Sequence, residues 1–382
     1  MKRTLFVLLM TMATLLGVGI GFGVSTATAA EPRSKHGTRS ASEPGTAVAM
    51  PLLDLHDGMV ARFGSTYYAY GTEYSCGFSW LSRPTPFCGF GVSTAPSLAG
   101  PWSSPTLLFD PRGTDPFTRL SWQQECGGTA QGCFNPRLIQ RSGWGADDDA
   151  FLLWFNAPYD VSSGKSSNAY NVMGCNGPAG PCGPSAGAPH GSFHKPALNY
   201  CKANGDFGLI AAPAGPPAIV CSMGGAASLS VERLDRWGSN GSNSGSLHVA
   251  GLTSVEGAGG FWDEVSGTFV VTYGTPNCGY CSGTGTGFAI ASSITGPYTA
   301  PSNYAAAAPP KLARALISGN SCGGQPRTVS VVDGEAYQGI DLWTGSRNET
   351  KAGWLLEPLD YTAQPNTPGP PWQPFAPWNC TP

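Results

Sequence analysis

A short strand pattern that follows a turn occurs five times along the chain, and it constrains the fold more than any other feature. In each copy apolar and aromatic residues alternate with small or polar ones, which is the pattern of a half-buried β-strand. Repeats of this size, each with room for several short strands, are typical of propeller blades and not of a sandwich. The sequence therefore predicts an all-β, five-bladed β-propeller. The copies are marked by Tyr67, Phe151, Ile219, Phe269 and Tyr337.

Composition agrees with a Gly-rich β-fold and excludes several other classes. The 382 residues include 53 Gly and 34 Pro; 11% of them are aromatic and only 12% are charged. A disordered chain is charged and poor in aromatics, and a coiled coil needs long heptads without Gly or Pro, so both are excluded. The net charge is −3 and the sequence has no run of basic residues, so it lacks the clustered positive charge that binds nucleic acid. We expect no nucleic-acid partner.

Residues 1–30 have the pattern of a signal peptide. Lys2 and Arg3 precede a mainly apolar stretch over 5–24, and the small residues of 27–29 (Ala-Thr-Ala) suit cleavage. An uncleaved membrane anchor is the alternative, because the apolar stretch is nearly long enough to span a bilayer. The small-residue cleavage site favours a secreted, extracellular protein without membrane attachment after cleavage.

The rest of the chain divides into three parts. A polar run rich in Ser, Thr, Gly and Pro predicts a flexible leader over 31–49. The strand pattern fills 50–361, which is the predicted propeller. Pro-rich residues 362–382 cannot form a central strand and predict an irregular tail.

All 12 cysteines follow the signal peptide, and an even number in an exported chain implies disulfides. Sequence alone does not fix their connectivity, but the clustering suggests neighbour pairs and one long-range pair that pins the tail. Cys278-Gly-Tyr-Cys281 has the local spacing of a zinc site, but no second such pair follows it, and we expect no metal. The suggested pairs are Cys76–Cys88, Cys126–Cys133, Cys175–Cys182, Cys201–Cys221, Cys278–Cys281 and Cys322–Cys380.

Two carboxylates stand among the polar residues that begin the predicted inner strands, where side chains of a propeller converge on its central channel. Asp57 precedes the first marker strand and Glu256 precedes the fourth. Such a pair suits hydrolysis of a glycosidic bond, which needs an acid for the leaving oxygen and a base for water. Glu256 has Gly and apolar neighbours and no adjacent cation, which favours the acid role. The alternative is that both carboxylates only cap turns or accept backbone hydrogen bonds.

Four groups of motifs follow one another in the order of the predicted blades. They are Leu55–Met59 with Tyr67–Thr72, Asn135–Ile139 with Phe151–Trp154, Ser254–Glu256 with Gly267–Tyr273, and Gly324-Gln325 with Asp341–Trp343 and Trp354–Leu359. In this order they resemble glycoside hydrolase family 43, a family of five-bladed β-propeller arabinofuranosidases, xylosidases, arabinanases and galactanases. The last blade resembles the exo-β-1,3-galactanase-like branch most. The resemblance covers residues 50–361.

The resemblance implies a glycosidase with Glu256 as general acid. Asp57 would be the base, but the galactanase-like branch tends to lack that aspartate and to assist water with a glutamine, which Gln325 matches. The base therefore stays open between Asp57 and Gln325. The branch also has a carboxylate that tunes the acid at the position of Asn135, so this chain departs from the pattern there. Asp206, which precedes the third marker strand, is a candidate to compensate.

The family resemblance also implies inversion at the anomeric carbon, for which the two carboxyl groups stand about 6.5–9.5 Å apart. The expected substrate-binding residues are His56, Asn135, Arg137 and Trp343, and Arg137 has the alternative of pairing with a central carboxylate. We expect a monomer without cofactor whose partner is a polysaccharide of galactan, arabinan or xylan type. Two alternatives stay open: a non-catalytic glycan-binding propeller with a decayed site, and a structural cell-surface scaffold without an aromatic-walled central pocket.

Overall fold

Antiparallel sheets are the main regular structure in the chain that the structure describes. The computed structural model describes residues 45–115, 118–129, 132–145, 148–157, 170–183, 195–202, 205–223, 228–249, 251–299, 315–361 and 374–381. They all belong to one compact unit, 43–382. The predicted signal peptide 1–30 and most of the predicted leader lie outside the described residues.

Five sheets follow one another along the chain with their strands in meander order, except that the outer strand of the fifth comes from the start of the described chain. Blade one contains β2 (His56–Phe63), β3 (Thr66–Thr72), β4 (Phe90–Ala95) and β5 (Thr106–Leu107). Blade two contains β6 (Phe134–Gln140), β7 (Phe151–Asn156) and β8 (Tyr170–Cys175). Blade three contains β9 (Phe207–Ile210), β10 (Ala218–Met223), β11 (Ser228–Leu234) and β12 (Gly241–Ser246). Blade four contains β13 (Glu256–Asp263), β14 (Thr268–Thr275), β15 (Gly285–Ala291) and β16 (Leu316–Ser318). Blade five contains β17 (Gln325–Val332), β18 (Glu335–Leu342), β19 (Gly353–Pro358) and β1 (Val48–Ala49).

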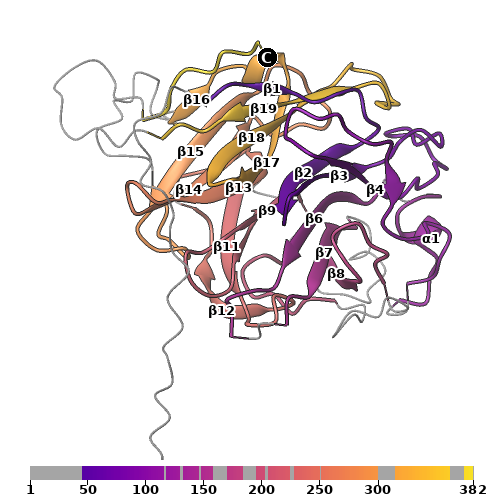
Figure 1. Ribbon diagram of the computed structural model, residues 1–382, viewed down its shortest axis with the longest axis horizontal. Coiled ribbons are helices and arrows are strands. Elements are labelled where there is room, and N and C mark those ends of the chain that lie inside the picture. The colour runs from indigo at the N-terminus through magenta and orange to yellow at the C-terminus, as the bar shows by residue number, and fades with distance from the viewer. Residues whose placement is uncertain are drawn as a thin grey trace, which may run out of the picture. The chain divides into compact units, whose positions relative to one another are not determined.

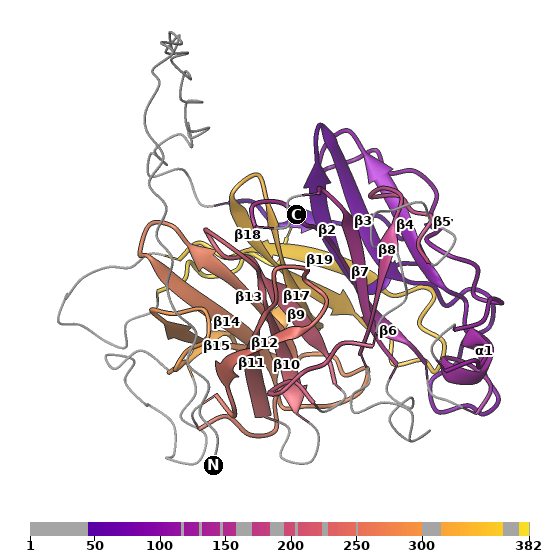
Figure 2. The ribbon, with the colours of Figure 1, turned by 90° about the horizontal axis from the view of Figure 1, so that it is seen from below.

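The first strands of the five blades form a closed ring. β2 contacts β6, β6 contacts β9, β9 contacts β13, β13 contacts β17, and β17 contacts β2 again (Figure 1). The predicted five-bladed propeller is confirmed, and the five sequence markers lie one in each second strand, β3, β7, β10, β14 and β18. Helix is limited in the described residues to α1 (Trp122–Glu125) and a 3-10 turn at Ser321–Gly323, and α1 lies at the outer edge in both views (Figure 2). Neither of these helices is long or apolar enough to cross a membrane.

The fifth blade is closed by residues from the start of the described chain. β1 pairs with β19, with Val48 opposite Leu356 and Ala49 opposite Leu355. Ala47 and Met50 on either side of β1 are buried. The predicted leader over 31–49 is therefore too long: its last residues belong to blade five because they complete that sheet's hydrogen bonding.

The hydrophobic core consists of layers between neighbouring blades. The layer between blades one and two contains Tyr70, Phe90 and Phe155, and Trp122 of α1 packs on Phe155 with ring centroids 5.5 Å apart. Trp154 belongs to the layer between blades two and three, and Trp354 to the layer between blades five and one. Aromatic side chains bury large areas, which is how short strands hold five separate sheets together.

Four of the five inner strands are irregular near their first residues. The pairing register shifts between His56 and Met59 in β2, between Phe134 and Arg137 in β6, between Glu256 and Gly259 in β13, and between Pro326 and Val329 in β17. A β-bulge of this kind re-aims side chains and is common beside functional sites. Asp57 and Asn135 occupy the bulges of β2 and β6 with positive φ angles of 50° and 60°, a conformation that Asp and Asn tolerate better than most residues.

Gly58, next to Asp57, allows the first bulge to form. A Cβ atom there would lie 1.6 Å from the backbone oxygen of Tyr70, so any side chain would push β2 away from β3. The inner strand thus bends toward the channel only because this position carries no Cβ.

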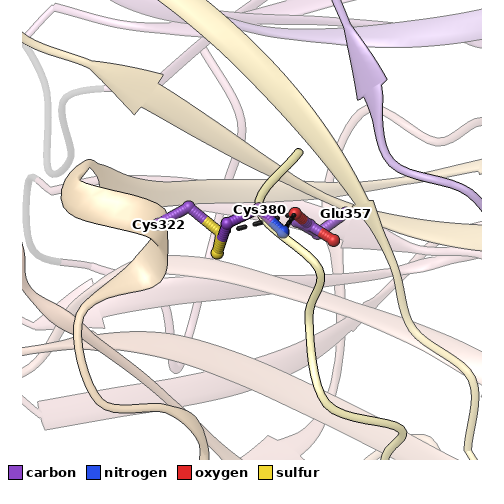
Figure 3. A group of neighbouring side chains, drawn as sticks. All are labelled: Cys322, Glu357 and Cys380. Carbon is purple, nitrogen blue, oxygen red and sulfur yellow. Dashed lines mark hydrogen bonds between the residues drawn. A yellow bond between two sulfur atoms is a disulfide. The ribbon is translucent and has the colours of Figure 1, made fainter. Parts of the chain in front are cut away.

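All six suggested cysteine pairs are disulfides in the structure. The long-range pair joins Cys322, at the entrance to blade five, to Cys380 in the tail. Figure 3 shows that Glu357 of β19 lies beside this disulfide, and its Oε1 accepts a hydrogen bond of 2.8 Å from the backbone N–H of Cys380. The tail is therefore fixed to blade five by a covalent bond and a hydrogen bond.

Removal of the Cys322–Cys380 disulfide by a double Cys→Ser change should reduce the free energy of unfolding by about 4 kcal/mol, because a long loop is released. The Cys126–Cys133 disulfide closes a loop of 7 residues and its removal should cost about 2.5 kcal/mol. Urea denaturation of both double variants measures the two losses. An equal or smaller loss for the long-range pair would show that the tail adds little to the stability of blade five.

Candidate active site

A central cavity of about 300 Å³ opens where the inner strands begin. Its wall combines acidic, amide and aromatic side chains from all five blades and their connecting loops. The lining residues are Asp57, Tyr74, Trp80, Phe134, Asn135, Asn156, Gly205, Asp206, Glu256, Cys278, Gly279, Tyr280, Gln325, Pro326, Arg327, Asp341 and Trp343. Asp57 and Glu256 thus line the same cavity.

Asp57 lies in the bulge of β2 and is held through one carboxylate oxygen. Its Oδ1 accepts hydrogen bonds from Thr72 Oγ1 at 2.7 Å and from the backbone N–H of Asn135 at 3.1 Å. Its Oδ2 has only a long contact of 3.4 Å to the hydroxyl of Tyr74. Burial, assisted by the nearby carboxylate of Asp341, raises the pKa of Asp57 to about 7. One oxygen of Asp57 is therefore anchored and the other is left for chemistry.

Glu256, the first residue of β13, is held in the same way. Its Oε1 accepts hydrogen bonds from the backbone N–H of Cys278 at 2.6 Å and from Gln325 Nε2 at 2.5 Å. Its Oε2 has no hydrogen-bond partner among the described residues. Burial and the negative charge of Asp206 raise the pKa of Glu256 to about 8. This shift favours the protonated form of Glu256 at neutral pH, and Oε2 is the free oxygen.

Gln325 orients Glu256 and is itself oriented by Trp343. Its Nε2 donates to Glu256 and to the backbone oxygen of Cys278, the latter at 2.8 Å. Its Oε1 accepts a hydrogen bond of 2.7 Å from the indole Nε1 of Trp343. An indole nitrogen can only donate, so it fixes which end of the amide faces Glu256. Both polar ends of Gln325 are occupied.

Asn135 lies between the cavity and a buried guanidinium. Arg137 Nη2 donates to Asn135 Oδ1 at 3.0 Å, and Asn135 Nδ2 donates to Asp206 Oδ1 at 2.9 Å. Asp206 directly precedes β9 and lines the cavity. The structure therefore brings Asp206 to the site, which the sequence did not show.

His56 and Arg137 do not line the cavity, although direct contact with substrate was expected of both. His56 is fully buried, its Nε2 lies 3.1 Å from Asp54 Oδ1, and its ring stacks on Tyr74 with centroids 4.7 Å apart. Arg137 is 1% exposed, and its Nη1 donates to the backbone oxygen of Asp57 at 2.6 Å. Both side chains lie behind the cavity wall and support it. The bulges turn Asp57 and Asn135 toward the cavity, and His56 and Arg137 face away from it.

A buried ion pair that the sequence reasoning missed lies next to Asp57. Arg327 Nη1 donates to Asp341 Oδ1 at 2.9 Å, and both side chains are almost fully buried. Burial raises the pKa of Asp341, while Arg327 opposes that shift. In the sequence, Asp341–Trp343 was noted only as a motif of the family resemblance. In the structure, Asp341 of β18 lies directly opposite Gln325 of β17, and this pairing brings Asp341 to the site.

Aromatic rings form the remaining wall. Trp80 packs on Tyr280 with ring centroids 5.1 Å apart, and Tyr280 packs edge-on against Trp343 at 4.7 Å. The hydroxyls of Tyr74 and Tyr280 are hydrogen-bonded at 2.8 Å. Trp262 packs on Phe269 within blade four and does not line the cavity. Rigid amphipathic rings beside carboxylates are a common lining for sites that bind sugars.

One group of potential metal ligands occurs in the described part of the chain, away from the cavity. It consists of Cys322, Glu357 and Cys380 (Figure 3). Both sulfur atoms belong to the same disulfide, so they offer no thiolate to a metal. The CxxC pair at Cys278 and Cys281 is likewise a disulfide.

Solved structures of glycoside hydrolases share this fold. An exo-β-1,3-galactanase from Phanerochaete chrysosporium, solved with β-1,3-galactotriose, matches with a TM-score of 0.57 and 17% identity over 81% of this chain and 61% of its own. A family 43 β-1,3-galactosidase with galactodeoxynojirimycin matches with a TM-score of 0.55 and 13% identity over 81% of this chain and 92% of its own. The native Bacillus subtilis arabinanase matches with a TM-score of 0.50 and 18% identity, covering 80% and 94%.

These identities establish a common fold with family 43 enzymes, the five-bladed propeller. The chain spans less than two thirds of the Phanerochaete enzyme. No family model matches the sequence, and no curated protein matches it.

Replacement of Arg137 by Met should destabilise the protein by about 3–5 kcal/mol, because it leaves buried acceptors and the carboxylate of Asp57 without their cation. Chemical denaturation monitored by Trp fluorescence measures the loss. The matched control is Arg112→Met, since Arg112 pairs with Asp110 on the exposed surface and should show no measurable change. Equal stability of the two variants would show that Arg137 does not support the site.

Proposed function

We propose that this chain is a secreted inverting glycoside hydrolase that acts on polysaccharide ends or side chains of galactan, arabinan or xylan type. The observation that carries the proposal is that Asp57 and Glu256 line one small cavity, each with one oxygen anchored and one available. The shared fold with family 43 galactanases and arabinanases supports the substrate class. The disulfides and the signal-like residues 1–30 support secretion.

Glu256 would act as the general acid. Its raised pKa leaves it protonated at neutral pH, and the anchors on Oε1 place the proton on Oε2. That proton passes to the glycosidic oxygen as the bond between this oxygen and the anomeric carbon breaks. Gln325 and the N–H of Cys278 keep the carboxyl group in place during the transfer.

Asp57 is the better candidate for the base. Its Oδ2 is available to take a proton from a water molecule that attacks the anomeric carbon from the opposite face, which inverts the configuration. Gln325, the alternative from the sequence, uses its Nε2 for Glu256 and Cys278 and its Oε1 for Trp343. We assign Gln325 to orientation of the acid, and we expect Asp57 and Glu256 at about the 6.5–9.5 Å separation of inverting enzymes.

The cavity favours an uncharged sugar. Besides Glu256, the proposed acid, the carboxyl groups of Asp57, Asp206 and Asp341 line it against one guanidinium, Arg327. A substrate with carboxylate or sulfate groups would meet like charge in a partly desolvated space. The aromatic wall argues against a purely structural scaffold. If the protein binds a glycan but does not hydrolyse it, the alternative of a non-catalytic glycan-binding propeller is supported instead.

The ratio kcat/KM should follow a bell-shaped pH dependence with its maximum between about 7 and 8. Activity rises as Asp57, with a pKa of about 7, loses its proton, and it falls as Glu256, with a pKa of about 8, loses its own. Initial rates between pH 5 and pH 10 on a soluble oligosaccharide measure both limbs. A profile that is flat through this range would exclude this acid–base pair.

Incubation of the mature chain with β-1,3-galactan, arabinan and xylan should release sugar from one of them. Glu256→Gln and Asp57→Asn should each lower the rate by about 10²–10⁴-fold, the usual contribution of a general acid or base. Mass spectrometry identifies the product, and proton NMR of its first-formed anomer reports inversion. Release that survives in the Glu256→Gln variant would show that the acid is another residue.

A further inference from the structure

A second pocket, of about 460 Å³, lies at the outer part of blade five. It is formed where β19 ends, between the residues that precede β1 and the C-terminal tail. Its described lining includes the carboxylates of Glu357 and Asp360, the indole of Trp378 and the rings of Pro358 and Pro377. It shares no described lining residue with the central cavity. We call this separate site the tail pocket.

Glu357 brings an unsatisfied acceptor to the tail pocket. Its side chain is 0% exposed, and its Oε1 accepts a hydrogen bond of 2.8 Å from the backbone N–H of Cys380. Its Oε2 has no hydrogen-bond partner among the described residues, and Figure 3 shows this second oxygen directed away from the Cys322–Cys380 disulfide. A buried carboxylate oxygen without a donor costs free energy. Oε2 therefore marks a place for a hydrogen-bond donor of a ligand.

A second carboxylate lines the same pocket. Asp360 Oδ2 accepts a hydrogen bond of 2.8 Å from the backbone N–H of Gly45. This bond and the bond from Cys380 to Glu357 come from neutral amides, which position a carboxylate without cancelling its charge. No Lys, Arg or His occurs among the described residues that line the pocket. Two carboxylates in a partly desolvated space repel one another, so a ligand with positive charge lowers their energy.

The size and the wall of the tail pocket indicate an organic cation and not a metal ion. A volume of about 460 Å³ is typical of pockets for organic ligands. The indole Nε1 of Trp378 donates to the backbone oxygen of Pro358 at 3.2 Å, which fixes the ring in the wall. An aromatic ring attracts an ammonium group through its quadrupole. The group of potential metal ligands around Glu357 is completed only by the two disulfide sulfurs, which offer no thiolate.

We propose that the tail pocket binds a small organic ammonium ion, the class that includes amino sugars and diamines. The ammonium group donates to Glu357 Oε2 and is attracted by Asp360, while the carbon skeleton lies against Trp378 and the two prolines. Because the pocket combines the residues before β1, the end of β19 and the tail, a bound ligand stabilises the closure of blade five. The site does not depend on the proposed function, since it uses no group of the central cavity.

The test is titration calorimetry near neutral pH with galactosamine and with putrescine, and with galactose as the uncharged match of galactosamine. At least one of the two amines should bind, and galactose should bind at least about tenfold more weakly, because it brings no charge to the carboxylates. Binding of only one amine identifies the ligand as an amino sugar or a diamine. The indole N–H signal of Trp378 in the NMR spectrum, assigned with Trp378→Phe, should shift on binding and so locates the ligand.

The decisive variant is Glu357→Gln, which keeps an oxygen for the N–H of Cys380 but removes the charge. It should weaken binding of the amine at least about tenfold. The matched control is Glu264→Gln, on the exposed surface of blade four, which should leave binding unchanged. Glu256→Gln alters the central cavity and should also leave it unchanged, which separates the two sites.

Four results would overturn the proposal: equal binding of galactose, amine binding that survives Glu357→Gln, displacement of the amine by Ca²⁺ alone, and no binding of either amine. Asp360→Asn removes the second charge of the tail pocket and serves the same comparison should the Glu357→Gln variant not fold.

Discussion

The buried guanidinium of Arg137 is the contact on which the cavity depends. Its three nitrogens bind the backbone oxygen of Asp57 in blade one, the side chain of Asn135 in its own blade two, and the backbone oxygen of Phe207 in blade three. A single rigid fork of donors thus sets the relative positions of three inner strands. A shift at Arg137 would displace Asn135, whose backbone N–H anchors Asp57.

The rim of the cavity depends on two loops that are closed by disulfides and whose aromatic residues pack together. The Cys76–Cys88 disulfide closes the loop that carries Trp80, and the Cys278–Cys281 disulfide closes the loop that carries Tyr280. Asn348 of blade five ties the first of these loops to its own blade, since its Nδ2 donates to the backbone oxygens of Tyr74 and Phe78. The sequence Asn348-Glu-Thr350 has the form of a glycosylation site, but the amide nitrogen that would carry the glycan is already used inside the protein.

The sequence predicted the fold well because propeller blades depend on local patterns. Each second strand has an alternating pattern of its own, and each disulfide except Cys322–Cys380 joins cysteines that are neighbours in the chain. The strands and these disulfides could therefore be predicted without long-range information. The candidate active site was harder to predict from the sequence. Asp57, Glu256 and Gln325 could be named from their place before a strand and from the family resemblance. Asp206 was named only as a candidate and Asp341 only as part of a motif, and the sequence did not show that either reaches the cavity. That depends on bulges and on cross-strand register, which set where a side chain points and leave little trace in composition.

The two carboxylate pairs explain why the proposed acid and base divide their roles as they do. Burial is the main cause that raises both pKa values. Asp341 also raises the pKa of Asp57, whereas the hydrogen bonds from Thr72 and Asn135 and the charge of Arg137 lower it. Asp206 also raises the pKa of Glu256, whereas the hydrogen bonds from Cys278 and Gln325 lower it. Glu256 keeps its proton to a higher pH than Asp57, which is the order that an acid and its base require.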